Sequence, residues 1–478
     1  MKTVDFNGKP FHFIGIGGIG MSALAYVLAK RHLPVSGSDL RSSHITQRLQ
    51  SAGAQIFNGQ DASNFQGFGA NLPLLNQDKK SSTPQVICST AINANNSEYR
   101  AAKELGYPIF HRSDVLAALI KDYDSIAVAG THGKTTTSSL IGYLLLEAGL
   151  DPTIIVGGEV DAWEGNARLG EGQFLVAEAD ESDGSLTKHS PKIGVITNIE
   201  LDHPDHYESL DEVIDTFTTF ASQCEVLVGC WDCETIRDRF QPTLTYSLNP
   251  DSGADYTVTE IQSRPQGLSA AVWERGKLLG QLTIGIPGVH NISNALAAVA
   301  VARYLGVDFA TIASALASFQ GAKRRFEYKG EANGVTFVDD YAHHPSELRV
   351  TLAAAQLKVQ QQQYRRVIAI FQPHRYTRTA TFLEDFGTSF AGADVVVLTD
   401  IYSAGEINVH LLTGQRVADE VSRHHEQVFY HPELSSLGLF LSQILQPGDL
   451  ALFLGAGNLN QIIPEMLGRY NLTGSKIA

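Results

Sequence analysis

Short runs of apolar residues recur along the whole chain, and most precede a segment in which apolar positions return every three or four residues. The runs are typical of buried β-strands, and the segments are typical of helices that pack one face against a sheet. The predicted strands include 11–14, 55–57, 85–90, 125–129, 366–371, 395–400 and 450–457. Strands that alternate with helices form mostly parallel sheets, so we predict an α/β protein.

Residues 257–282 do not follow this alternation of strands and helices. Polar and apolar residues alternate there, which predicts a meander of antiparallel strands. The 478 residues suffice for about three domains of ordinary size. We place the boundaries near residues 121 and 321. The domains are then a Rossmann-like one at 1–120, a central P-loop ATPase-like one with a mostly parallel sheet at 121–320, and a Rossmann-like, doubly wound one at 321–478.

Composition narrows the class of protein. The net charge of −15 argues against a nucleic-acid partner, since no basic face is implied. The first residues lack the apolar stretch of a signal peptide, and no run reaches the roughly 18 apolar residues of a membrane span. Four cysteines suggest no disulfide framework, and the Cys230/Cys233 pair has no second pair with which to bind zinc. We therefore predict a cytoplasmic protein without membrane insertion.

The apolar run at 125–129 leads into a glycine-containing turn and then into a helix. Such a turn directs backbone N–H groups at an anion, at the positive end of the helix dipole. Lys134 would reach the outer phosphates of a nucleotide, and the Thr135 hydroxyl would bind Mg²⁺. Val128 stands where the full P-loop pattern has its first glycine, and a tight turn without a ligand is the alternative. The predicted phosphate loop comprises Gly130, Thr131, His132, Gly133, Lys134, Thr135 and Thr136.

Acidic side chains follow two later strands. Four acids, Glu178, Asp180, Glu181 and Asp183, come directly after an apolar run that begins at Phe174. Carboxylates at a strand end beside a P-loop commonly hold Mg²⁺, although a solvated acidic loop would look the same. Asp202 and His203 follow the run that begins at Ile193 and suggest a second cation site. An imidazole is an unusual ligand for Mg²⁺, which prefers oxygen.

Near the N-terminus, a strand, the glycine pattern 15–20 and a helix occur in that order, and Asp39 follows. This is the dinucleotide fingerprint, which predicts NAD binding. Backbone N–H groups do not distinguish one pyrophosphate from another, so the diphosphate of a nucleotide sugar fits equally well. A glycine turn without a ligand is the third alternative.

In the third predicted domain, cationic and imidazole side chains follow strands. The cluster 323–326 could meet phosphate charge, although a solvated cluster is the commoner case. His344, Arg375 and Arg378 would share one edge of the sheet, where guanidinium groups suit a carboxylate ligand. His290 and Asn294, at a predicted helix start, can cap that helix or read the edge of a base.

These motifs together resemble the Mur ligases of bacterial peptidoglycan synthesis over nearly the whole chain. The matching segments are 15–21, 130–137, 178–183, 197–203, 290–295, 323–326, 339–345 and 371–378. The family usually has glycine where Ala342 stands, which could shift the neighbouring histidines slightly.

The resemblance implies an ATP-dependent amide ligase that joins L-alanine to the lactyl carboxylate of UDP-N-acetylmuramate through an acyl phosphate. The catalytic residues would be Lys134, Glu178, His203, His344, Arg375 and Arg378. The cofactors would be ATP and Mg²⁺, with Thr135, Glu178 and His203 as metal ligands. ATP would also contact His290, Asn294 and Arg325. The UDP-sugar would contact Gly15, Gly17, Gly18, Gly20, Met21, Ser38, Asp39 and Ser89.

Several points stay open at this stage. His343, His344 and His203 are all candidates to accept the proton of the alanine ammonium group. A recycling ligase that adds a peptide to the same acceptor, an NAD-dependent oxidoreductase and a catalytically silent nucleotide-binding regulator are the competing hypotheses. The expected assembly is a monomer or a weak homodimer.

Overall fold

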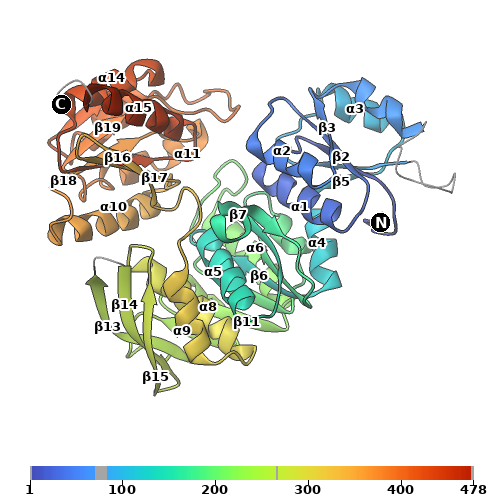
Figure 1. Ribbon diagram of the computed structural model, residues 1–478, viewed down its shortest axis with the longest axis horizontal. Helices are drawn as coiled ribbons and strands as arrows, with labels where there is room; N and C mark the ends of the chain where they lie inside the picture. The colour runs from blue at the N-terminus through green and yellow to red at the C-terminus, as the bar shows by residue number, and fades with distance from the viewer. Residues whose placement is uncertain (1–2, 70–82, 265–266, 475–478) are drawn as a thin grey trace. The chain divides into compact units, whose positions relative to one another are not determined.

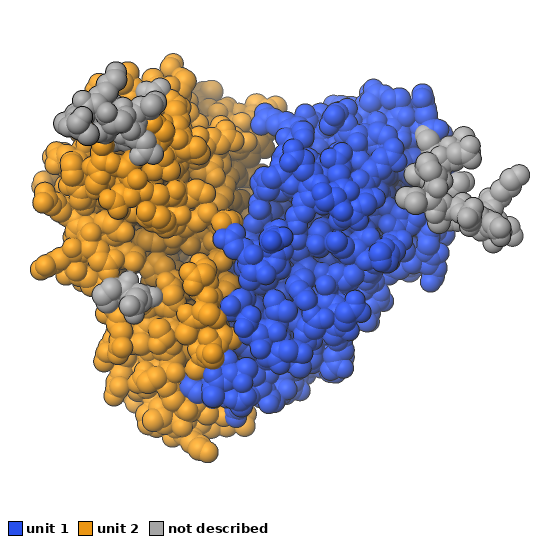
Figure 2. All heavy atoms as spheres, viewed as in Figure 1, with its two compact units in different colours: residues 1–199, 214–245, 297–311 blue, residues 200–213, 246–296, 312–478 orange. Residues whose placement is uncertain are grey.

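The computed structural model describes residues 3–69, 83–264 and 267–474 (Figure 1). The chain divides into two compact units, coloured separately in Figure 2. The first comprises residues 1–199, 214–245 and 297–311, and the second comprises 200–213, 246–296 and 312–478. Each unit is described by itself.

The first unit begins with a five-stranded parallel sheet in the order β3-β2-β1-β4-β5. Its strands are β1 (Phe11–Ile14), β2 (Val35–Asp39), β3 (Gln55–Asn58), β4 (Gln85–Cys88) and β5 (Ile109–His111). The helices that accompany them are α1 (Ile19–Lys30), α2 (His44–Ser51), the 3₁₀ helix η1 (Ala62–Gly69), α3 (Ser97–Glu104) and α4 (Arg112–Asp122). The strand order reverses between β1 and β4, and ligands of such sheets bind at that switch point. The glycine loop after β1 lies there.

The same unit holds a second, mostly parallel run of strands in the order β11-β10-β6-β9-β7-β8. The strands are β6 (Asp124–Ala129), β7 (Thr153–Val160), β8 (Gly165–Arg168), β9 (Phe174–Glu178), β10 (Ile193–Ile196) and β11 (Val226–Cys230). Only β8 runs antiparallel to its neighbour. Because β6 lies between β9 and β10, their carboxyl ends bring three sequence motifs to one edge. The helix α5 (Lys134–Glu147) follows β6 directly, and α7 (Glu234–Arg239) follows β11.

The second unit contains the predicted meander, in which β13 (Tyr256–Arg264), β14 (Gly267–Glu274) and β15 (Lys277–Ile284) pair antiparallel. The short strand β12 (Leu244–Ser247) pairs parallel with β13. Three helices include residues of both units: α6 (Leu210–Ser222), α8 (His290–Tyr304) and α9 (Phe309–Ser318).

The last sheet of the second unit has six strands in the order β16-β17-β21-β18-β19-β20. They are β16 (Glu327–Ala332), β17 (Val335–Asp340), β18 (Arg366–Phe371), β19 (Val395–Leu398), β20 (Val428–Tyr430) and β21 (Asp449–Leu454). Only the edge strand β16 is antiparallel. The helices are α10 (Pro345–Gln360), α11 (Tyr376–Thr381), α12 (Leu383–Gly387), α13 (Gly414–Val421), α14 (Leu434–Ile444) and α15 (Ile463–Gly474).

Alternating side chains of this sheet build two separate cores. Val367, Ala369 and Phe371 of β18 pack with α10, whereas Ile368 and Ile370 pack with α14 and α15. Successive residues of a strand point to opposite faces, so a strand covered on both sides must be apolar throughout. Helices accordingly lie on both faces of this sheet (Figure 1), as expected of a doubly wound fold.

The structure confirms the predicted α/β class, with three mostly parallel sheets and the meander. The predictions for three strands were wrong at their carboxyl ends, because β4 stops at Cys88, β19 at Leu398 and β21 at Leu454. Polar residues follow β4 and β19 and a glycine-containing segment follows β21, and in each case the chain leaves the sheet there. None of the helices in the described residues has the length and apolar character needed to cross a membrane.

Candidate active site

The loop between β6 and α5 has the backbone geometry of a phosphate loop. Gly130 has φ +138° and Gly133 has φ +80°, both in the region that favours glycine. Gly133 stands at the N-cap position of α5, and Lys134 and Thr135 open its first turn. The N-terminal N–H groups of this helix and its dipole favour a bound anion. The loop is therefore shaped to accept phosphate oxygens.

Two residues at the end of β10 hold this loop. Asn198 receives a hydrogen bond from the His132 N–H at its side-chain oxygen (2.8 Å) and one from the Thr131 N–H at its carbonyl oxygen (3.0 Å). Thr197 Oγ1 donates to the carbonyl oxygen of His132 at 2.6 Å. The sequence prediction placed neither residue in the site, although both lie in a motif that it singled out.

Lys134 lies along the loop. Its Nζ donates to the carbonyl oxygens of Gly130 (2.7 Å) and Thr131 (3.1 Å) and to Glu181 Oε1 (2.9 Å). Burial alone would lower the pKa of Lys134, but the neighbouring carboxylates outweigh it and raise that pKa above its ordinary value. The ammonium group is thus a permanent positive charge in the phosphate loop.

The acids after β9 have different surroundings. Glu181 is buried at 2% exposure, and burial raises its pKa to about 7 against the opposing charge of Lys134. Glu178 accepts a hydrogen bond from the Gly157 N–H on β7 at 2.7 Å through Oε2. A side chain at Gly157 would collide with that carboxylate, because its Cβ would lie 2.5 Å from Glu178 Oε1. Glu178 is therefore fixed at the strand end, beside the loop that carries Lys134.

The N-terminal glycine loop is fixed by the end of β2. The N–H groups of Gly15 and Ile16 donate to the carbonyl oxygen of Ser38 at 2.8 and 2.9 Å. The Gly17 N–H donates to Asp39 Oδ2 at 2.9 Å. In the NAD hypothesis, the acidic residue after the second strand would bind the ribose. Here that carboxylate is used to hold the loop, which favours the alternative of another diphosphate.

The remaining residues predicted for the sugar nucleotide have different exposures. Gly18 is the N-cap of α1, and Met21 is buried in that helix. Ser89 is half-buried and lies just beyond β4. Ser38 is fully buried, so its side chain faces the interior of the sheet and only its carbonyl oxygen supports the loop.

Behind Ser38 lies a buried polar network that the sequence prediction missed. Glu98 of α3 is fully buried and accepts hydrogen bonds from the Ser38 hydroxyl and from Asn64 Nδ2 at 2.8 Å. His12 Nε2 lies 2.7 Å from Glu98 Oε1, and its Nδ1 lies 2.9 Å from Ser36 Oγ. A buried carboxylate needs such partners to offset its lost hydration. The network fixes β2, and with it the glycine loop.

In the second unit, Arg378 is buried against the Asp202–His203 motif. Its Nε donates to Asp202 Oδ1 at 2.8 Å, and its Nη2 lies 3.4 Å from His203 Nδ1. Burial would raise the pKa of Asp202, but the charge of Arg378 holds it well below the ordinary value. His203 Nε2 lies 3.5 Å from Asp202 Oδ2. Both ring nitrogens of His203 therefore lie near charged side chains of the same unit.

Arg375 has two acidic partners in the same unit. Its Nη1 donates to Asp205 Oδ2 at 2.9 Å and to Glu406 Oε1 at 3.2 Å. Glu406 also accepts from the N–H (3.1 Å) and the hydroxyl (2.8 Å) of Thr377. The sequence prediction missed Glu406, which lies in a loop with no recognised motif.

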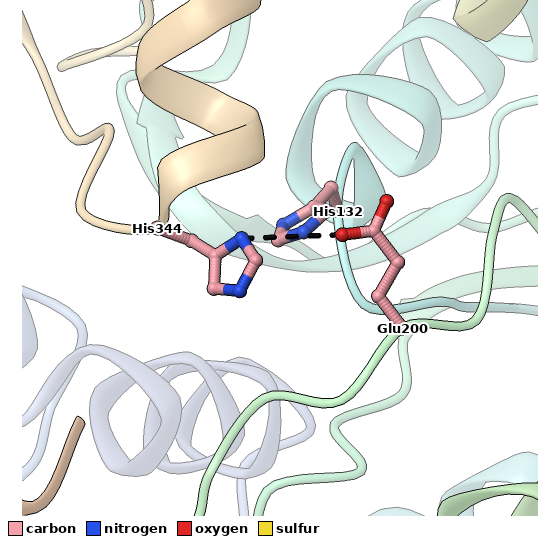
Figure 3. Close-up of side chains that lie close together, drawn as sticks. All are labelled: His132, Glu200 and His344. Carbon is pink, nitrogen blue, oxygen red and sulfur yellow. Dashed lines mark ion pairs between the residues drawn. The ribbon is translucent and has the colours of Figure 1, made fainter. Parts of the chain in front are cut away.

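The two adjacent histidines have different hydrogen-bond roles. His344 is buried and caps α10, since its Nδ1 accepts from the Ser346 N–H at 3.3 Å, which leaves the proton on Nε2. His344 Nδ1 also lies 4.0 Å from Glu200 Oε2 (Figure 3). The Ser346 hydroxyl donates to the same carboxylate at 2.8 Å. His343 Nδ1 lies 2.9 Å from the Tyr341 carbonyl oxygen, so the proton is on Nδ1 and Nε2 is the acceptor. Burial lowers the pKa of His343 to about 4, which keeps this ring neutral near pH 7.

The residues predicted for the adenine side lie at the start of α8 and after α9. Burial lowers the pKa of His290 to about 4, so that ring is neutral as well. Asn294 Nδ2 donates to Asn291 Oδ1 at 2.9 Å. The guanidinium of Arg325 lies 5.3 Å from the ring centroid of Tyr341, in cation–π contact.

Each unit thus brings together part of the predicted set. The first unit joins the phosphate loop, Lys134 and the acids after β9, and it holds the glycine loop at the switch point of its other sheet. The second unit joins His203 with Arg378, and it places Arg375 on the same segment.

Comparison with protein families decides the class. Three family models match consecutive segments: the catalytic domain of the Mur ligase family at 10–124, the Mur ligase middle domain at 128–302 and the Mur ligase glutamate ligase domain at 324–457. The chain belongs to the Mur ligase family. Together the matched segments cover most of the residues.

Two relatives are similar over nearly their full length. The UDP-N-acetylmuramate–L-alanine ligase of Microcystis aeruginosa is 73% identical over 470 residues, which cover 98% of this chain and 98% of that protein. The enzyme of the same name from Nostoc punctiforme is 67% identical and covers 98% of this chain and 97% of its own.

Solved structures agree. The crystal structure of the UDP-N-acetylmuramate–alanine ligase from Thermotoga maritima matches with a TM-score of 0.81 and 29% identity, over 97% of this chain and 99% of that one. A murein peptide ligase from Psychrobacter arcticus matches with a TM-score of 0.72 over 96% and 98%, but at 22% identity this likeness shows the fold alone. The sequence similarity therefore favours the alanine ligases over the peptide-adding relatives.

Proposed function

We propose that this Mur ligase uses ATP to join L-alanine to the lactyl carboxylate of UDP-N-acetylmuramate, a step of peptidoglycan synthesis and cell-wall biogenesis. The observation that carries the proposal is the 73% identity to a ligase of that name over 98% of both chains. The carboxylate attacks the γ-phosphate of ATP and yields an acyl phosphate and ADP. The amine of alanine then attacks the acyl carbon, and inorganic phosphate leaves.

In this proposal the phosphate loop binds ATP through the N–H groups of residues 130–136. The Lys134 ammonium group stabilises the charge on the transferring phosphoryl group. Its hydrogen bonds to loop carbonyls and to Glu181 keep it in the loop. His290, Asn294 and Arg325 are the proposed adenine-side residues, and neutral His290 suits a base edge better than a charged ring would.

The residues of the first unit fit Mg²⁺. The Thr135 hydroxyl and the Glu178 carboxylate offer oxygen atoms, which this ion prefers, and Glu178 uses only Oε2 for Gly157. A bound Mg²⁺ would neutralise phosphate oxygens of ATP. Thr135 and Glu178 are the proposed ligands. His203 stays a prediction as a ligand of a second ion, and its contacts with Arg378 and Asp202 give that role no support.

The glycine loop is the proposed site for the diphosphate of UDP-N-acetylmuramate. Five of the proposed contact residues lie around the N-terminus of α1: Gly15, Gly17, Gly18, Gly20 and Met21. Ser38, Asp39 and the buried Glu98 network hold the loop from behind. Ser89, at the end of the adjacent strand β4, completes the proposed set.

Arg375 and Arg378 are the proposed partners of the alanine carboxylate, with His344 beside them. Of the three histidines that could accept the amine proton, we propose His343, because its Nε2 is an acceptor. The acceptor nitrogen of His344, Nδ1, is used by the Ser346 N–H at the cap of α10. The Nδ1 of His203 faces the Arg378 guanidinium group. His343→Gln should lower kcat and flatten the acidic limb of the pH profile of kcat. An unchanged profile would contradict this role.

Release of inorganic phosphate tests the proposed function. The purified protein is mixed with ATP, MgCl₂ and UDP-N-acetylmuramate, and each of L-alanine, glycine, L-serine and a cell-wall tripeptide is added separately. Release that requires both the sugar nucleotide and L-alanine is the expected result. Release with the tripeptide alone would assign the recycling reaction. A change of NADH fluorescence on mixing, without phosphate release, would support the oxidoreductase instead.

Two further predictions belong to the proposal. We propose three domains at 1–120, 121–320 and 321–478, and limited proteolysis should cut near the two boundaries first. The proposed assembly is a monomer or a weak homodimer, which sedimentation at several protein concentrations measures directly.

A further inference from the structure

Arg112 is a cation that none of the sequence motifs includes. It is the first residue of α4, and its side chain is 23% exposed. Its Nη2 donates to Asp180 Oδ2 at 2.7 Å, and the same nitrogen lies 3.8 Å from Asp183 Oδ2. Asp180 is two residues beyond Glu178. One end of the guanidinium group is therefore fixed at the acidic strand end of β9.

The other end of the group lies at the glycine loop. A Cβ atom added to Gly20 would lie 3.1 Å from Arg112 Nη1, which is closer than nine in ten contacts of Cβ atoms. Gly20 is the second residue of α1, so Nη1 lies at the N-terminal turn of that helix. Within the described residues, Nη1 makes no hydrogen bond, in contrast to Nη2.

Arg112 keeps its positive charge, because its surroundings raise the pKa of the guanidinium group. Burial would lower the pKa of the guanidinium group, but Asp180, Asp183 and Glu178 together raise it further. If Arg112 served only to hold α4 in place, its ion pair with Asp180 through Nη2 would be enough. That structural role does not explain why Nη1 lies against Gly20, a glycine of the proposed diphosphate loop.

We propose that Arg112 binds the β-phosphate of the sugar nucleotide through Nη1, while Asp180 acts as a positioning residue through Nη2. This inference rests on the proposed function, which puts the UDP diphosphate at the glycine loop. The β-phosphate is chosen because the sugar it carries must extend toward the acids of β9, the side on which Asp180 holds the group. A planar guanidinium group can donate to both partners at once, whereas a lysine ammonium group at the same place cannot keep that geometry.

The test compares the affinities of UDP and UMP by calorimetry. In Arg112→Ala the affinity for UDP should fall about 10- to 100-fold, the usual loss for a charged hydrogen bond, whereas the affinity for UMP should fall less than about threefold. Arg112→Lys should recover part of the UDP affinity. Asp180→Asn keeps an acceptor for Nη2 and should lose less than Arg112→Ala. Arg100→Ala, an exposed site on α3, is the matched control and should change neither affinity.

Kinetics give an independent readout. In Arg112→Ala the KM for UDP-N-acetylmuramate should rise by a similar factor, whereas the KM for ATP should stay within about twofold. Equal losses for UDP and UMP, or equal rises of both KM values, would reveal a structural role and overturn the inference. An unchanged UDP affinity would overturn it too. If the wild-type protein binds no UDP at all, the proposed function fails along with it, and that result is distinct from a defect confined to the variants.

Discussion

Gly130 offers the sharpest test of the phosphate-loop geometry. Its φ of +138° is strained for any residue with a side chain. A Cβ atom there would lie 1.9 Å from Thr197 Oγ1 and 3.1 Å from the Thr197 N and Cβ atoms. The Thr197 hydroxyl is the group that donates to the His132 carbonyl oxygen at 2.6 Å. Gly130→Ala therefore strains the backbone and also displaces the residue that holds the loop.

The two effects can be separated. The positive φ alone costs about 1–2 kcal/mol for alanine. Moving Thr197 adds about 1–3 kcal/mol for overpacking and about 1 kcal/mol for the lost hydrogen bond. Gly149 is the matched control, because it has φ +75° and nothing within 4 Å of an added Cβ. Gly130→Ala should therefore destabilise the protein by about 2–4 kcal/mol more than Gly149→Ala.

Thermal unfolding and the KM for ATP are the measurements. Gly130→Ala should lower the melting temperature more than Gly149→Ala does and should raise the KM for ATP at least about tenfold, because the loop N–H groups are displaced. Adding Thr197→Ala removes the hydroxyl that the new Cβ meets, so the double variant should be more stable than the two single effects predict. Equal effects of Gly130→Ala and Gly149→Ala, or an unchanged KM for ATP, would refute the reasoning.

Three further predictions concern charged groups. Lys134→Ala should reduce the rate of phosphate release with UDP-N-acetylmuramate and L-alanine at least about 100-fold, because the transferring phosphoryl group loses its cation. Asp202→Asn leaves Arg378 buried without its carboxylate and should destabilise by about 3 kcal/mol in thermal unfolding, whereas Asp122→Asn, in a half-exposed pair, should change stability by less than about 1 kcal/mol. Burial raises the pKa of Asp340 to about 6, so the folded state holds this proton more tightly than the unfolded state, and the contribution of the group to stability declines between about pH 4 and pH 6. Asp340→Asn removes that decline, and its stability relative to wild type should grow by up to about 3 kcal/mol over this range; a constant difference across the melting curves would contradict this.

The fold could be predicted because its signals are local in the sequence. Apolar runs and helical spacing identify strands and helices within a few residues, and the phosphate loop is contiguous in the chain. Lys134 and Gly133 could be placed at a helix start for this reason. Strand ends are less certain, since the predicted strands ran on over the polar residues that follow β4 and β19.

Contacts between residues that are far apart in the chain could not be predicted from the sequence. Arg112 meets Asp180 from 68 positions away, and the His12–Glu98 pair spans 86. A lone arginine at a helix start or a glutamate in a polar helix carries no local signal. Only the fold shows that Glu98 is buried and that Gly20 leaves room for a guanidinium group.

His344 shows a different limit. The sequence placed it among the residues for the amino acid, and the structure puts its Nδ1 at the cap of α10. The capping pattern, with Glu347 at the third helical position, was present in the sequence. Recognising it would have shifted attention to His343, whose Nε2 is the acceptor.

A common arrangement unites the proposed binding groups. Four of the proposed cations already have a carboxylate partner within their own unit: Lys134 has Glu181, Arg112 has Asp180, Arg378 has Asp202 and Arg375 has Asp205. A cation buried without a partner would be costly, so these acids keep the cations charged and in place. A substrate anion must then compete with a carboxylate for each cation, which lowers ground-state affinity. In the proposed reaction, the same exchange of partners would let each cation stabilise the negative charge that develops in the transition state. On this proposal, an acidic protein can bring a carboxylate and ATP together because the cations are local to the site.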